Sequence, residues 1–170
     1  MGNFGLSFWL LFVSIILTIL LLIYLFKRKD NSQLHNVFII NCIFTLIISV
    51  GVFLQSLLSY IFKIDPIIFE SFIYIGTCFL PVSAFFASSV FVNTKIKFKK
   101  SYLLLFIVPI LSLLVLWTNN YHHLFYVKYS HSFSETINGP YMYIHTLYSY
   151  ILLFISIARL LHFSIKNSGF

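Results

Sequence analysis

Long apolar runs occupy most of this sequence, and they restrict its fold more than any other feature does. The first extends from Leu6 to Phe26 and is broken only by Ser7, Ser14 and Thr18. A helix needs about 20 mainly apolar residues to cross the hydrocarbon core of a bilayer. Only 9% of the residues are charged, whereas soluble domains contain about 25%. The sequence therefore predicts an all-α, polytopic transmembrane helix bundle in a lipid bilayer.

Five transmembrane helices are expected, over residues 6–26, 37–62, 67–92, 102–118 and 142–163 of a single domain that covers residues 1–170. Pro66 and the turn signal Asn138-Gly139-Pro140 mark connections between the runs. Pro81 falls inside the third expected helix, where neighbouring helices can satisfy the carbonyl group that it frees. The connection over residues 119–140 is the longest. Because residues 124–129 have strand character, we expect a small hairpin there.

The basic residues indicate which side of the membrane each end of the chain occupies. Positively charged side chains collect in cytoplasmic segments. If the N-terminus lies outside, nine of the 11 Lys and Arg are cytoplasmic, and only Lys63 and Lys128 are outside. The nine are Lys27, Arg28, Lys29, Lys95, Lys97, Lys99, Lys100, Arg159 and Lys166. We therefore expect an outer N-terminus, a cytoplasmic C-terminus and a long outer loop between the fourth and fifth helices.

The charge pattern and the motif content also argue against several function classes. The net charge of +7 comes from short clusters between apolar runs, and a nucleic-acid partner would need a basic stripe on a polar surface. The sequence contains no Gly-rich phosphate loop, HExxH, GxSxG or CxxC motif. Its four acidic residues do not form a pair suited to acid–base catalysis. We therefore predict no nucleic-acid partner, no catalytic residue, no cofactor and no bound metal.

Small polar side chains recur at helical spacing in the second and third expected helices. Asn41, Thr45 and Ser49 fall on one face, and Ser88 forms a small-xxx-small pair with Ala84. Such positions let membrane helices approach closely and form hydrogen bonds across the contact. Asn41 and Ser88 are therefore predicted to pack helices together.

The fifth expected helix carries His145, Ser149, Ser156 and Arg159 along one stripe. Ionisable residues within membrane helices usually face the bundle and often mark function. His145 lies close to the outer end, where a functional and a structural role are both open. For Arg159, the structural alternative is that its long side chain places the guanidinium group among the lipid headgroups of the cytoplasmic side.

Histidines also concentrate in the outer loop. Asn119-Asn-Tyr-His-His-Leu-Phe-Tyr follows the fourth helix and contains His122 and His123. Histidine titrates near physiological pH and is a common metal ligand, but two histidines without a third ligand at fixed spacing do not define a metal site. We take Asn119, His122, His123 and His145 as candidates for binding a small ligand or sensing protons. The alternative is that they cap helix ends and bridge the hairpin.

Three stretches resemble one family, in the right order and at matching helix positions. Trp117-Thr-Asn-Asn-Tyr-His-His-Leu-Phe-Tyr resembles the end of the fourth helix in the seven-transmembrane input module of bacterial sensor histidine kinases and some diguanylate cyclases. Tyr74-Ile-Gly-Thr-Cys-Phe-Leu-Pro is similar to its third-helix element, and Gly139-Pro-Tyr-Met-Tyr-Ile-His-Thr-Leu-Tyr-Ser-Tyr to the start of its fifth helix. These motifs add Tyr148 to the ligand candidates, and Gly76 and Pro81 to the helix-packing positions.

The resemblance implies a multi-pass sensor in the bacterial cytoplasmic membrane. Such a sensor receives an extracellular or intramembrane signal and passes it to a cytoplasmic kinase or cyclase domain, and it is expected to be a homodimer once joined to that domain. The family's module has seven helices and an output domain, whereas this sequence contains the first five helices and no kinase or GGDEF motif. We expect a truncated gene product, a fragment of a longer protein or a free-standing subunit, and not an enzyme.

Two other function classes stay open beside this leading hypothesis. A small oligomeric transporter or channel subunit would be favoured by ionisable residues along a path or by broken helices in corresponding halves, and neither pattern is present. An intramembrane peptide-processing enzyme would use Cys78 with an outer histidine. The spacing does not favour that arrangement over an inert buried thiol.

Overall fold

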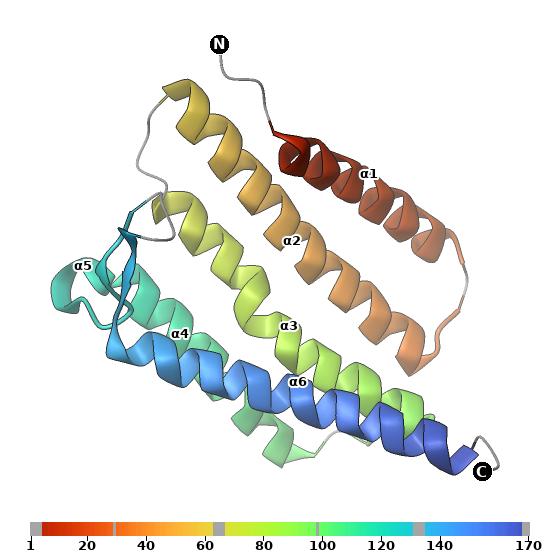
Figure 1. Cartoon of the computed structure of the whole chain (residues 1–170). Coiled ribbons are helices and arrows are strands. Elements are labelled where there is room, and N and C mark those ends of the chain that lie inside the picture. Colours follow the sequence, from red (N-terminus) through yellow and green to blue (C-terminus); the bar gives the residue numbers. More distant parts are fainter. Residues whose placement is uncertain (1–4, 29, 63–66, 98, 131–134, 168–170) are drawn as a thin grey trace.

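The computed structural model describes residues 5–28, 30–62, 67–97, 99–130 and 135–167. Lys29, Lys63 and Pro66, which were used above to assign charges and connections, lie outside the described residues. The elements are α1 (Leu6–Lys27), α2 (Gln33–Phe62), α3 (Ile67–Asn93), the 3-10 helix η1 (Lys100–Phe106), α4 (Ile107–Trp117), α5 (Asn119–His122), β1 (Tyr126–Lys128), β2 (Ile137–Asn138) and α6 (Pro140–Asn167) (Figure 1).

Helices suited to a membrane dominate the fold. Within the described residues, five helical stretches are long and apolar enough to span a bilayer, and η1 and α4 together form one of them. This confirms the predicted transmembrane helix bundle. Large apolar side chains also cover its outside, as Leu6, Leu10 and Leu17 do on α1. Because a soluble protein rarely exposes such a continuous apolar surface, the surrounding solvent is lipid.

Two helices begin earlier than their apolar runs predict. α2 starts at Gln33 rather than residue 37, since Ser32 Oγ accepts a hydrogen bond from the backbone N–H of His35 at 3.2 Å. This N-cap satisfies a backbone donor that has no partner within the helix. α6 starts at Pro140 rather than residue 142. Proline suits the first helical position because its φ angle is already helical and no N–H is needed there.

The fourth span departs from the single α-helix expected over residues 102–118. Residues Lys100–Phe106 form a 3-10 helix, and the α-helix begins only at Ile107. Pro109 explains the change, because its ring cannot donate an N–H and would clash with the carbonyl of Leu105 in a continuous α-helix. Proline is tolerated in the first turn of a helix, and Pro109 occupies that turn of α4.

α3 lies at the centre of the bundle. It packs against α2, η1, α4 and α6, whereas α1 packs against α2 at the edge (Figure 1). α3 accordingly carries side chains that are fully buried in the bundle, among them Cys78, Val82 and Val90. α3 is therefore the helix against which most of the other spans pack.

The predicted helix-packing positions lie on α2 and α3. A Cβ atom at Gly76 would come within 2.7 Å of the carbonyl oxygen of Phe44, so the backbones of the two helices are close at this point. Asn41 Oδ1 accepts a hydrogen bond from Ser83 Oγ at 3.0 Å. Ser88 is buried and donates to the carbonyl of Phe85 at 2.9 Å within its own helix. Pro81 is buried inside α3.

Candidate functional site

A small hairpin closes one end of the bundle. β1 and β2 are antiparallel, with Tyr126 opposite Asn138 and Lys128 opposite Ile137; β1 coincides with the stretch that had strand character. We call residues 118–130 and 135–139 the cap, which comprises α5, the hairpin and the turn into α6. The cap sits where α4 ends and α6 begins (Figure 1).

Asn119, the first residue of α5, holds the loop of the cap together. Its side chain is only 4% exposed. Asn119 Nδ2 donates to the carbonyl of Tyr126 at 2.9 Å, and Oδ1 accepts from the backbone N–H groups of Phe125 at 2.9 Å and Tyr126 at 3.0 Å. A buried amide that makes three hydrogen bonds to the backbone fixes the path of the loop. Asn119 therefore shapes the cap from within, and its polar atoms are already occupied.

The turn at Gly139 fixes how the cap meets α6. Gly139 donates its N–H to the carbonyl of Phe125 at 2.8 Å, and Tyr141 donates to the carbonyl of Leu124 at 3.0 Å. A Cβ atom at position 139 would lie 2.1 Å from the carbonyl oxygen of Leu124. This contact is with backbone, which has no rotamer to change, so a side chain cannot be accommodated without displacing the loop.

A carboxyl group at the start of α3 ties the cap to α2 and α3. Glu70 accepts hydrogen bonds from the hydroxyls of Tyr126 at 2.8 Å and Tyr129 at 3.1 Å. Gln55 Nε2, on α2, donates to the Tyr129 hydroxyl at 2.9 Å and to Glu70 at 3.3 Å. The Tyr126 hydroxyl also lies 3.2 Å from that of Tyr74. We call Gln55, Glu70, Tyr74, Tyr126 and Tyr129 the tyrosine–glutamate cluster.

The sequence patterns did not predict this cluster. A lone acidic residue at the start of an apolar run was the available signal. Tyrosines are common at membrane interfaces, so the residue type alone does not single out these three. Burial raises the pKa of Tyr126, and the neighbouring Tyr74 and Glu70 raise it further. The Tyr126 hydroxyl therefore stays protonated and remains a donor to Glu70.

His145 lies beneath the cap, at the junction of three helices. It is 3% exposed, and its Nδ1 atom is 3.0 Å from Ser112 Oγ on α4. Its ring also lies near Tyr74 of α3, 5.7 Å between centroids, and Phe125 of the cap, at 6.1 Å. One turn further along α6, the hydroxyl of Ser149 is buried without a hydrogen-bond partner among the described residues.

The other candidates occupy different surroundings. His122 accepts a hydrogen bond from the N–H of Leu124 at 3.0 Å and lies 2.9 Å from the Thr118 hydroxyl. His123 ends α5 in the left-handed conformation, with φ of 53°, and its side chain is exposed. The structure therefore does not bring His123 against the buried His145. Tyr148 donates its hydroxyl to the carbonyl of Leu105, where α6 meets η1.

The part of the chain that the structure describes offers little for bond-making chemistry. Cys78 has 0% exposure, packed with Tyr74, Leu113 and Phe125. No group of three or more His, Cys, Asp or Glu among the described residues is placed to hold a metal ion. The arrangement instead ties the cap by hydrogen bonds to α2, α3 and α6.

The fold and this cap define a multi-pass helical membrane protein with a small hairpin at one end of the helix bundle. The chain matches the family model described as the N-terminal 7TM region of histidine kinase over residues 10–170, and it belongs to that family. No curated protein and no solved structure matches the chain significantly. The match covers the first apolar helix from residue 10 onward and the other four in full, which supports a membrane sensory input module of the histidine kinase type.

Proposed function

We propose that the cap is the signal-receiving surface of this input module. The observation that carries the proposal is that Glu70 of α3 accepts hydrogen bonds from Tyr126 and Tyr129 of the cap. Asn119 and Gly139 fix the loop and the turn within the cap. Loops on a rigid scaffold commonly carry binding residues. A signal that moves the cap acts directly on α3, which packs against most of the other spans.

The proposed orientation places the cap outside the cell, with the N-terminus outside and the C-terminus in the cytoplasm. It rests on the basic residues. Lys95, Lys97, Lys99 and Lys100 all lie between α3 and α4, at the end of these helices opposite the cap. Positive charge collects on the cytoplasmic side. In a bacterium this membrane is the cytoplasmic membrane.

The candidate residues divide into those that contact a signal and those that transmit it. We propose that a small polar ligand or a proton acts at the exposed His123, beside the partly exposed His122. Asn119, His145 and Tyr148 transmit the change, because each joins two elements by a hydrogen bond. Residues 1–170 act as one sensory unit, which forms a homodimer when joined to a kinase or cyclase output domain and has no catalytic activity of its own.

The buried state of Cys78 weighs against the peptidase alternative, because a peptide bond cannot approach a sulfur atom that has no exposed surface. The transporter alternative needs ionisable groups along a path through the membrane. Among the described residues, His145 is the imidazole that lies inside the bundle between the tyrosine–glutamate cluster and Arg159. Its Nδ1 atom already contacts Ser112. A single imidazole in this position does not form such a path.

A kinase fusion tests the proposal. Residues 1–170 are joined through the C-terminus to the dimerisation and catalytic regions of a histidine kinase, and autophosphorylation is measured in membrane vesicles. Asn119→Ala releases the cap and should shift autophosphorylation severalfold from that of the parent fusion, at equal protein amounts. Asn120→Ala, on the exposed neighbouring side chain, should leave it unchanged. Equal autophosphorylation in all three proteins would reject a role of the cap in signalling.

A further inference from the structure

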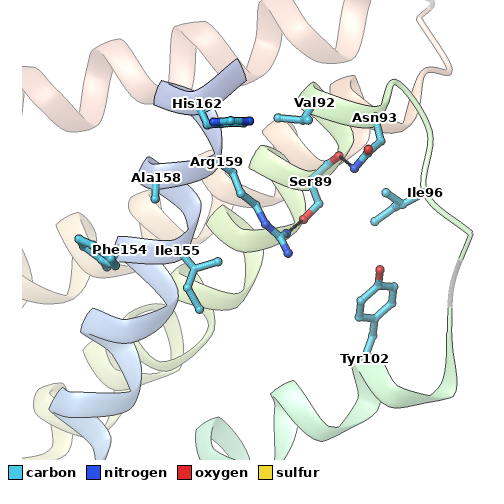
Figure 2. A pocket seen from close by; sticks show the side chains of 10 residues that line it. All are labelled: Ser89, Val92, Asn93, Ile96, Tyr102, Phe154, Ile155, Ala158, Arg159 and His162. Carbon is cyan, nitrogen blue, oxygen red and sulfur yellow. Dashed lines mark hydrogen bonds between the residues drawn. The ribbon is translucent and has the colours of Figure 1, made fainter. Parts of the chain in front are cut away.

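A second polar site lies at the end of the bundle away from the cap. An open cavity of about 530 Å³ lies between α3, η1 and α6 (Figure 2). Its polar lining includes Ser89 and Asn93 of α3, Tyr102 of η1, and Arg159 and His162 of α6. Figure 2 shows the Arg159 side chain crossing from α6 toward α3, where its Nη1 atom donates to Ser89 Oγ.

Among the residues that the structure describes, no carboxylate pairs with Arg159 in this cavity. Its guanidinium group contacts the Ser89 hydroxyl and lies over the Phe85 ring, 4.5 Å from the centroid. Within the described residues the ion pair is the one between Arg28 and Asp30, and Glu70 belongs to the cluster at the opposite end. A charge within a membrane span normally pairs with a counter-charge. Arg159 therefore has donors left for an anion.

The surroundings of the cavity are basic as well. Lys95 and Lys97 follow α3, Lys99 and Lys100 lead into η1, and Lys166 lies on the last turns of α6. These exposed charges attract an anion to this end of the bundle. The guanidinium fork of Arg159 then supplies paired donors, which suit the oxygens of a phosphate group.

The walls of the cavity indicate where that phosphate comes from. Val92, Ile96, Phe154, Ile155 and Ala158 line it with apolar surface, and Phe154 is 73% exposed on the outside of the bundle. Ser89 is four residues from the end of α3, about 6 Å along the helix axis. The cavity therefore lies at the level of the headgroups and borders on acyl chains.

We propose that this cavity binds the phosphate headgroup of an anionic phospholipid, with Arg159 on the phosphate and the apolar wall against its acyl chains. Basic pockets between membrane helices are a recurring form of lipid site. The inference rests on membrane insertion and on the cavity alone. It holds whichever end of the bundle receives a signal, so its failure and the failure of the cap proposal are separate results.

Native mass spectrometry of the purified chain tests the site, with phosphatidylglycerol and phosphatidylcholine supplied together in mild detergent. The parent chain should retain phosphatidylglycerol preferentially. Arg159→Gln should weaken its binding about fivefold or more, the effect of about one cation at a membrane surface. Lys166→Gln, which removes the same charge from the same helix outside the cavity lining, should weaken binding clearly less than Arg159→Gln does. Equal losses in both variants would mean diffuse attraction and overturn the site.

Two further variants separate the site from a folding defect. Arg159→Lys keeps the charge but loses the paired donors, and should bind more tightly than Arg159→Gln and less tightly than the parent. Ala158→Phe keeps every charge, fills the cavity and should abolish binding. Normal binding by Ala158→Phe, with helix content unchanged by circular dichroism, would overturn the proposal. Inorganic phosphate at millimolar concentration distinguishes the source of the ligand. Displacement of phosphatidylglycerol by this phosphate would assign the site to a free anion and reject the lipid.

Discussion

Asn119 and His123 lie on the same turn of the cap but contribute to it in different ways. The amide of Asn119 is buried and bound to three backbone groups, whereas the imidazole of His123 is exposed. Both belong to one sequence motif, and the motif alone does not separate them. The hydrogen bonds of Asn119 assign it to the framework of the cap and leave His123 as the side chain that meets solvent.

Replacing Asn119 with alanine should destabilise the cap. The N–H groups of Phe125 and Tyr126 lose their shared acceptor in a buried position, which costs about 1–3 kcal/mol. Hydrogen exchange of the Phe125 and Tyr126 amides should accelerate accordingly. Asn120→Ala is the matched control, because its side chain is exposed. Unchanged exchange at both amides in Asn119→Ala would show that these bonds do not hold the loop.

The buried Tyr126 should titrate only at strongly alkaline pH. Its raised pKa means that the folded state holds the phenol proton more tightly than the unfolded state does. The protonated Tyr126 therefore contributes to the free energy of unfolding below about pH 10, the ordinary tyrosine pKa. This contribution is lost as the pH rises further. Absorbance titration around pH ~10 should be the same for Tyr126→Phe and parent. A smaller signal in Tyr126→Phe than in the parent would contradict the burial of Tyr126.

At the scale of the elements, the turn into α6 is the most constrained part of the cap. Gly139→Ala should displace the backbone at Leu124 or unfold the turn, because its Cβ atom has no space. We expect a loss of about 1–3 kcal/mol, the usual range for overpacking, measured as a lower thermal unfolding temperature in detergent. Gly5→Ala is the control, since its Cβ atom would meet nothing nearer than 3.7 Å. Equal unfolding temperatures would mean that the loop adjusts freely.

The apolar runs predicted the spanning helices well, because a bilayer demands a minimum apolar length whatever the partners are. Their ends were less predictable. The start of α2 depends on the N-cap residue Ser32, and the change from η1 to α4 depends on Pro109. Neither residue alters the hydropathy of its segment strongly. The tyrosine–glutamate cluster was not predictable, since it joins Gln55, Glu70 and Tyr129 from distant parts of the chain.

At the scale of the whole molecule, the two ends of the bundle have different chemistry. The cap end carries hydrogen-bonded tyrosines, a carboxyl group and histidines, whereas the opposite end carries lysines and Arg159. α3 connects the two, from Glu70 in its first turn to the cavity lined by Ser89 and Asn93. This difference between the two ends agrees with a module that receives a signal at one end and contacts acidic lipids at the other.

The sidedness of the cap tests the central claim most directly. Cys42 and Cys78 are replaced with serine, and a single cysteine is introduced in place of Lys128 of the cap or of Lys97, both exposed positions. An impermeant maleimide is then applied to intact cells. The account predicts labelling of Lys128→Cys in intact cells, and labelling of Lys97→Cys only after the membrane is permeabilised. Labelling of Lys97→Cys but not Lys128→Cys in intact cells would contradict it.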